Sequence, residues 1–185
     1  MHRVFQNFND ISPDFRPNKK DRQTVKKIFP HWETPEAIKV FSRYEYRLSD
    51  YAYWYVLSTL WVSYTGGSNL DEWKRLFGSS RPGRDSGIMK PGELDIFKRL
   101  EDPLTLYRAH RPGETDWISY SLFMENAAVF AAKRGVFHVS AYLVKKSDVL
   151  CLFLRRGEFE VLVLDKSKAE FLYKRPVTGR EFIDV

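Results

Sequence analysis

The architecture of this chain is indicated most clearly by residues 117–131, which read WISYSLFMENAAVFA. Two hydroxyl residues, Ser119 and Ser121, stand two positions apart, so in a strand they would lie on one face. The alanine-rich stretch from Met124 to Lys133 then predicts a helix. Ser121 could also serve as the N-cap of that helix. A strand that passes directly into a helix favours a mixed fold.

The chain changes character at Pro103. After Pro103 the chain has short β-rich runs at 104–107, 136–144, 149–154 and 160–164. Before Pro103 the apolar residues recur with helical spacing, and residues 78–92, with four Gly and two Pro, predict a loop. We therefore expect an α+β protein with an N-terminal arm, a helical subdomain and a β-rich core, which cover 1–20, 21–102 and 103–185.

The composition fits a folded protein from a reducing compartment. The chain has 185 residues, 43% of them hydrophobic, and a single cysteine, Cys151, which excludes an intrachain disulfide and a cysteine-based zinc cluster. We see neither a secretory signal nor a run long enough to span a bilayer, and we expect a cytoplasmic protein. The net charge is +6, and residues 1–100 hold 17 Lys and Arg against 12 Asp and Glu. This excess could attract nucleic acid or an acidic protein, or could simply keep the surface solvated.

Two further stretches carry residues suited to chemistry. Arg108 ends the run LTLYR (residues 104–108), and its rigid, permanently charged guanidinium could clamp a phosphate or meet a carboxylate or water. In RGEFEV (residues 156–161), Glu158 and Glu160 are two positions apart and would point the same way in a strand. Neighbouring carboxylates repel, so the pair suggests a use for its charge, the alternative being a polar turn before a solvated strand.

Taken in order, these stretches resemble the Arg–Ser–Glu pattern of the mono-ADP-ribosyltransferases. The resemblance is strongest to small bacterial and phage members, whose Ser motif runs into a helix like AAVFA (127–131) and whose last motif resembles residues 156–161. WKRLF (73–77) and SSRPGR (79–84) resemble their N-terminal extension, and the likeness covers roughly residues 50–165. It implies an ADP-ribosyltransferase-like fold with two small packed β-sheets around an NAD cleft and an N-terminal helical subdomain.

The resemblance also implies a role for each motif residue. Arg108 would hold the pyrophosphate and ribose side of NAD, and Ser119 would contact the nicotinamide ribose and orient Glu160. Glu160 would bind the ribose 2′-hydroxyl and stabilise the cation-like ribose as nicotinamide leaves. Glu158 would orient or deprotonate the acceptor.

Further residues near these motifs would complete the NAD site. Ala109 stands where many relatives have Gly, and Tyr120 where Thr or Trp is commoner. Phe123 is another candidate for stacking on a ring of NAD. The remaining candidates for NAD contact are His110, Trp117, Ser121 and Phe130. We expect no metal, since the four histidines lack ligand spacing.

The function implied is an NAD-dependent mono-ADP-ribosyltransferase, a phage or bacterial effector or toxin acting in a bacterial cytoplasm. Protein arginine is the favoured acceptor, because an acidic residue at the position of Glu158 usually accompanies arginine. The expected partner is a host target or an antitoxin, and we expect no association with a membrane. ADP-ribosylation of RNA or DNA, and NAD glycohydrolysis, stay open as alternatives. From another class, a non-catalytic basic module that binds RNA or protein stays open too, and the sequence does not predict the oligomeric state.

Overall fold

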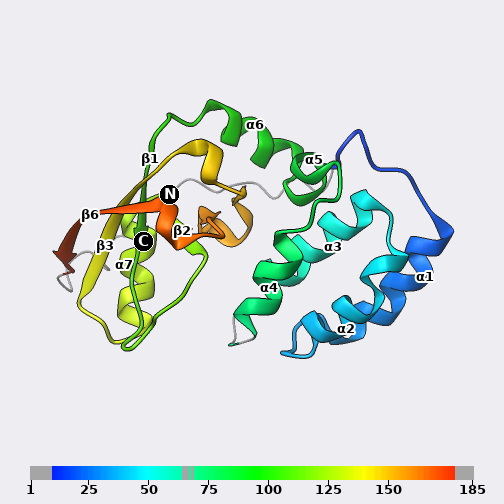
Figure 1. Ribbon diagram of the computed structural model, residues 1–185, viewed down its shortest axis with the longest axis horizontal. Coiled ribbons are helices and arrows are strands. Elements are labelled where there is room, and N and C mark those ends of the chain that lie inside the picture. Colours follow the sequence, from blue (N-terminus) through cyan, green and yellow to red (C-terminus); the bar gives the residue numbers. More distant parts are fainter. Residues whose placement is uncertain (1–9, 64–66, 68, 178–185) are drawn as a thin grey trace. The chain divides into compact units, whose positions relative to one another are not determined.

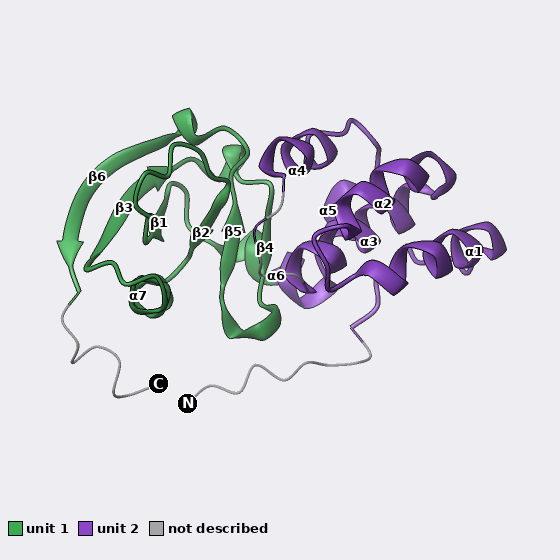
Figure 2. Cartoon of the chain, turned by 90° about the horizontal axis from the view of Figure 1, so that it is seen from below, with its two compact units in different colours: residues 1–6, 96–185 green, residues 7–95 purple. Residues whose placement is uncertain are grey.

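The computed structural model describes residues 10–63, 67 and 69–177, which form an α+β fold (Figure 1). The chain divides into two compact units, residues 7–95 and residues 96–185 with 1–6 (Figure 2). The division falls inside α6 (Pro91–Arg99), slightly before the boundary expected at residue 102. Residues 10–20, expected to belong to a separate arm, are part of the helical unit, and the last two of them begin α1 (Lys19–Ile28). Residues 1–9 of the expected arm lie outside the described residues.

The helical unit is built from short helices whose ends are set by local polar groups. The Asn18 side chain caps the first helix by accepting hydrogen bonds from the backbone N–H groups of Lys20 and Asp21. Asn69 caps a later helix through the N–H of Glu72. The helices are α1 (Lys19–Ile28), α2 (Ala37–Tyr44), α3 (Asp50–Ser63), α4 (Leu70–Phe77) and α5 (Arg84–Ile88), with 3-10 turns η1 (Phe29–His31) and η2 (Glu45–Arg47).

The loop expected at residues 78–92 is wrong in part, because it contains α5 and the start of α6. Gly and Pro count against a helix in a sequence pattern, but here a glycine is what lets α5 pack. Gly87 is buried against Trp54 of α3, where a larger residue would not fit. Tertiary packing therefore overrides the local preference.

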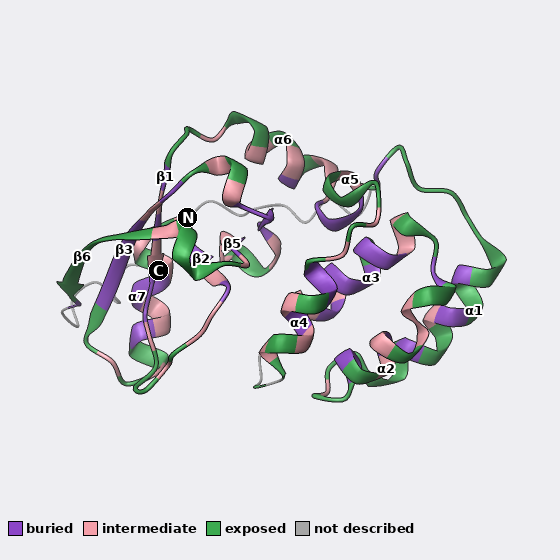
Figure 3. Ribbon diagram, in the orientation of Figure 1, coloured by how far each residue is buried: buried purple, intermediate pink, exposed green. Residues whose placement is uncertain are grey.

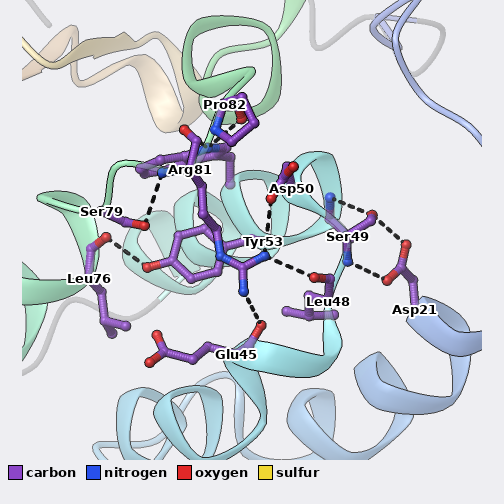
Figure 4. A network of polar contacts seen from close by, with 12 residues as sticks. Asp21, Glu45, Leu48, Ser49, Asp50, Tyr53, Leu76, Ser79, Arg81 and Pro82 are labelled. Atoms are coloured by element: carbon purple, nitrogen blue, oxygen red, sulfur yellow. Dashed lines mark hydrogen bonds and ion pairs between the residues drawn. The ribbon is translucent and has the colours of Figure 1, made fainter.

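The core of the helical unit is centred on α3, whose buried residues lie between Tyr53 and Leu60 (Figure 3). Arg81 joins the surrounding segments: its guanidinium donates to the carbonyls of Leu48 (2.9 Å) and Glu45 (3.0 Å) and lies 4.5 Å from the ring centroid of Tyr53 (Figure 4). The Tyr53 hydroxyl donates to the carbonyl of Leu76 at 2.8 Å. Burial raises the pKa of Tyr53 to about 12, so the ring stays neutral beneath the arginine.

In its described residues the second unit holds six antiparallel strands, in the order β4-β5-β2-β1-β3-β6. Helix α7 (Met124–Lys133), predicted from its alanines, packs on this sheet through Ala127, Ala128 and Ala131. The strands are β1 (Leu104–Arg108), β2 (Ser119–Ser121), β3 (His138–Val144), β4 (Cys151–Phe153), β5 (Glu160–Leu162) and β6 (Ala169–Pro176), with 3-10 turns η3 (Lys146–Asp148), η4 (Arg155–Gly157) and η5 (Lys166–Lys168).

The expected pair of packed sheets is replaced by one continuous sheet in the described residues. β1 and β2 are in register at one residue pair, Tyr107 with Ser121, whereas β1 and β3 pair from Leu104–Val144 to Arg108–Ser140. The sheet is thus narrowest between β2 and β1. Strand β6, which the sequence analysis did not predict, lies at the edge beside β3 and is mostly exposed.

None of the helices in the described part of the chain has the length and apolar character needed to cross a membrane.

Replacing Gly87 with alanine tests the packing of α5 on α3. A Cβ atom at this position would lie 2.8 Å from Cβ of Trp54, so the helices must separate. We expect a loss of roughly 1–3 kcal/mol in the free energy of unfolding, measured by urea titration with tryptophan fluorescence. Gly67→Ala is the control, because its Cβ would meet no atom within 4 Å and should change stability by less than about 0.5 kcal/mol. Equal effects of the two substitutions would contradict the packing account.

Candidate active site

Arg108 and Ser119 lie where β1 and β2 part from each other. The pairing of Tyr107 with Ser121, continued along both strands, would set Ala109 opposite Ser119, but the ladder ends at Tyr107. Instead the Arg108 guanidinium donates a hydrogen bond to the main-chain carbonyl of Ser119. A side chain thereby satisfies a carbonyl that regular pairing leaves without a strand partner.

Ser119 also connects to Glu160, which begins β5. The Ser119 hydroxyl donates to Oε1 of Glu160 over 2.5 Å. β5 pairs with β2 so that Glu160 faces Ser121 and Leu162 faces Ser119, which brings the carboxylate beside the hydroxyl. The structure therefore brings Arg108, Ser119 and Glu160 together from three strands, with Ser119 in the middle.

The charge of Arg108 is balanced by Glu114, a residue the sequence analysis missed. The pair is bidentate, with Nε to Oε2 at 3.0 Å and Nη2 to Oε1 at 2.6 Å, and both side chains are about nine-tenths buried (9% and 10% exposed). Nδ1 of His110 lies 3.0 Å from the same carboxylate, and its Nε2 lies 2.7 Å from the Tyr142 hydroxyl. Burial by itself would raise the pKa of Glu114, but the hydrogen bonds from His110 and Arg108 outweigh it and lower the pKa to about 2.

All three guanidinium nitrogens of Arg108 are thus engaged, by Glu114 and by the Ser119 carbonyl. The charge of Arg108 is already balanced by Glu114, so a diphosphate would compete with that carboxylate for the guanidinium. A further guanidinium, that of Arg134, lies at the same end of β1 and donates to the Ala109 carbonyl. Burial and then repulsion by Arg108 and Arg111 lower the pKa of Arg134 to about 10. This concentration of positive charge favours an anion at the end of β1.

Trp117 lies among charged and aromatic side chains. Its ring meets the ring of His110 edge-on at 4.3 Å between centroids, and its Nε1 donates to the Tyr120 hydroxyl at 2.8 Å. The Arg108 guanidinium and the ammonium of Lys166 lie 5.8 and 5.1 Å from its ring. Tyr120 itself is buried, which raises its pKa to about 12, so it is a core residue that holds Trp117 by its hydroxyl.

The turn before Glu160 has an unusual backbone. The φ angles of Arg156, Gly157 and Phe159 are 67°, 71° and 47°, a region that residues with a side chain rarely adopt. The Phe159 carbonyl accepts from the N–H of Leu122 at 2.9 Å, and the Asn126 side chain donates to the Gly157 carbonyl at 2.9 Å. These contacts, with the residue that follows β2 and with α7, hold the turn in place and fix where β5 begins.

Glu158 does not share a strand with Glu160, contrary to our expectation. β5 begins at Glu160, and Glu158 is in a helical conformation before it, because the left-handed Phe159 interrupts the alternation. Its carboxylate lies 3.9 Å from the Arg156 guanidinium, and its side chain is 29% exposed.

The remaining candidates lie around the junction of α7 and the sheet. Ala109 is buried in the cluster formed by α7, and Phe130 packs at the margin of that cluster beneath the Arg134 guanidinium. Ser121 is buried on β2 and does not cap α7, whose N-cap is Phe123 without a side-chain hydrogen bond. Phe123 is 44% exposed and stacks edge-on with Phe159.

No family model, curated protein or solved structure matches this chain. Within the described residues, we find no group of three His, Cys, Asp or Glu side chains placed to hold a metal. The features of this chain that bear on its function are therefore the geometry around Ser119 and the sequence motifs.

Glu114→Gln tests the ion pair that supports the site. Because the folded-state pKa of Glu114 is lowered, its contribution to stability is full above its unfolded pKa of about 4.3 and disappears as the pH falls through about 2. The variant should lose about 3 kcal/mol of unfolding free energy at pH 7, since it leaves the buried Arg108 without a counter-charge. That deficit should shrink steadily between pH 5 and pH 2, measured by urea unfolding at each pH.

Glu101→Gln serves as the matched control, since Glu101 is exposed and removal of its charge should leave the stability of the chain nearly unchanged at each pH. A deficit for Glu114→Gln that stays constant from pH 7 to pH 2 would contradict the ion-pair account.

Proposed function

We propose that this chain is an NAD-dependent mono-ADP-ribosyltransferase that transfers ADP-ribose to a macromolecular acceptor and releases nicotinamide. The observation that carries the proposal is the linkage of Arg108, Ser119 and Glu160 through Ser119. Ser119 lies 11 residues after Arg108 and 41 residues before Glu160, and each of the three matches a motif of that family. Their meeting from β1, β2 and β5 is what a site made from those motifs requires.

The chemistry of the reaction suits Glu160. When the bond between ribose and nicotinamide breaks, positive charge develops on the ribose, and a carboxylate beside it stabilises that charge. The Ser119 hydroxyl donates to one oxygen of Glu160 and so fixes the direction of the carboxylate. The strained backbone at Phe159 is of the kind found at functional sites and independently favours a role for this turn.

We assign the diphosphate of NAD to the positive end of β1. Arg108 holds the Ser119 carbonyl and its partner Glu114, which suits a positioning role. Arg134 and Arg111 add positive charge there, and they would supply attraction for the diphosphate without breaking that ion pair. Trp117 and Phe123 are the aromatic residues we assign to the rings of NAD.

Glu158 is the residue we assign to the acceptor. It precedes β5, is partly exposed and lies outside the hydrogen bond that fixes Glu160, so its carboxylate can meet a second substrate. By the family resemblance this position favours protein arginine as the acceptor. We place the reaction in a bacterial cytoplasm, with the chain as a phage or bacterial effector.

Glu160→Gln tests the proposed chemistry. Removal of the negative charge should reduce nicotinamide release from NAD by at least about 100-fold, measured by chromatography, because the charge on the ribose is no longer balanced. Ser119→Ala should cost about tenfold, the equivalent of one hydrogen bond to a charged group. Glu170→Gln, an exposed residue of β6, is the control and should behave as wild type. Wild-type protein that releases no nicotinamide and labels no lysate protein, or Glu160→Gln equal to wild type, would refute the proposal.

Glu158→Gln tests the acceptor. With labelled NAD and an arginine-containing peptide, the ratio of modified peptide to free ADP-ribose should fall about tenfold or more, because a positioned base typically contributes at least that much. The ratio is measured by mass spectrometry, with Glu170→Gln again as the control. An unchanged ratio would argue against Glu158 as the acceptor-facing group, and label that is removed by nuclease and not by protease would point to a nucleic acid acceptor.

A further inference from the structure

The helical unit carries a concentration of positive charge on its first helix. Five exposed cations lie along α1, at Lys19, Lys20, Arg22, Lys26 and Lys27. The single acidic residue of this helix, Asp21, is buried, and its carboxylate accepts hydrogen bonds from the N–H and the hydroxyl of Ser49 at 2.8 and 2.6 Å (Figure 4). The exposed sides of α1 therefore carry cations without an intervening carboxylate.

A cation from a second element, Arg47, meets Lys27 of α1 at the ring of Tyr44. The ammonium of Lys27 and the guanidinium of Arg47, in η2, lie 5.2 and 5.7 Å from the ring centroid of Tyr44. Arg47 also lies 5.4 Å from the ring of Tyr46, which is 65% exposed. Lys20 stands seven residues before Lys27, so it projects from the same side of α1 about 10 Å along the axis. We call these five residues the basic–aromatic surface.

Besides Asp21, Glu45 is the acidic residue adjacent in sequence to this surface, and it is already engaged. Its Oε1 lies 3.1 Å from Nη1 of Arg75, which also pairs with Glu72 at 2.9 Å. The charge of Glu45 is thus directed to α4, and the contacts described for Lys27 and Arg47 are with tyrosine side chains. The basic–aromatic surface keeps its positive charge toward solvent.

We propose that the basic–aromatic surface binds single-stranded nucleic acid. Lys20, Lys27 and Arg47 are suited to neighbouring phosphates, and the exposed ring of Tyr46 to stacking with an unpaired base. An acidic protein would use the same cations, but it would have no need for an accessible ring beside them. Binding at this surface belongs to the helical unit and requires no NAD, so it extends beyond the proposed transferase reaction.

The test is the binding of a fluorescent oligouridylate, measured by anisotropy over a range of salt concentrations in the absence of NAD. For K20A/K27A/R47A we expect the affinity at low salt to fall at least about tenfold. The slope of log affinity against log salt should fall by about 2, because each phosphate contact on a single strand contributes about 0.7. Y46A should weaken binding about tenfold with an unchanged slope, since stacking involves no charge.

The matched control is K145A/K168A/K174A, which removes the same charge from exposed positions of the other unit and should reduce the slope far less. Circular dichroism confirms that each variant is folded. The proposal is overturned if the two triple variants give equal slopes, or if the wild-type chain fails to bind the oligouridylate at low salt. It is also overturned if polyglutamate binds as tightly and depends on the same three cations, which would indicate an acidic protein as partner. Because NAD is absent, none of these outcomes depends on the transferase proposal.

Discussion

The candidate site depends on the ion pair between the buried Arg108 and Glu114, at the narrowest point of the sheet. Arg108 cannot lose its charge, so its burial requires a counter-ion and hydrogen-bond acceptors. Glu114 supplies the counter-charge, and the Ser119 carbonyl takes the remaining hydrogen bond. This arrangement keeps β1 and β2 together just beyond their one registered pair and sets the Ser119 hydroxyl against Glu160.

In both units, arginine side chains donate hydrogen bonds to main-chain carbonyls at the ends of helices and strands. In the helical unit Arg81 donates to Glu45 and Leu48, at the turn between α2 and α3. In the sheet unit Arg134 does so for Ala109, directly after β1. Buried carbonyls that have left a helix or a ladder still need a donor, and a guanidinium reaches them with several N–H groups at once. Part of the chain's large basic content is therefore structural, while the cations of α1 stay exposed.

The sequence predicted the elements whose burial imposes a residue pattern. It did not predict the elements and contacts that depend on tertiary packing. Helix α7 and the buried strands follow from alanine content and from β-branched runs, but β6 is an exposed edge strand, so no alternation marks it. Helix α5 was not predicted, because Gly87 counts against a helix in the sequence although it allows α5 to pack on α3. Glu114 lies in the turn after β1, and only the tertiary structure shows that it meets Arg108. A charged residue shortly after an isolated strand arginine is the signal that could have indicated it.

The motif before Glu160 shows how a sequence pattern and its geometry can differ. Glu158 and Glu160 resemble two carboxylates on one strand face, yet the left-handed backbone at Phe159 separates a turn residue from a strand residue. That separation leaves Glu160 held by Ser119 and Glu158 partly exposed, so two similar side chains acquire different environments. The same reasoning applies to Arg108. Because it holds Ser119 and Glu114, its loss would disturb Glu160 whether or not it touches a ligand, so a decrease in activity on substituting Arg108 would not by itself identify a ligand contact.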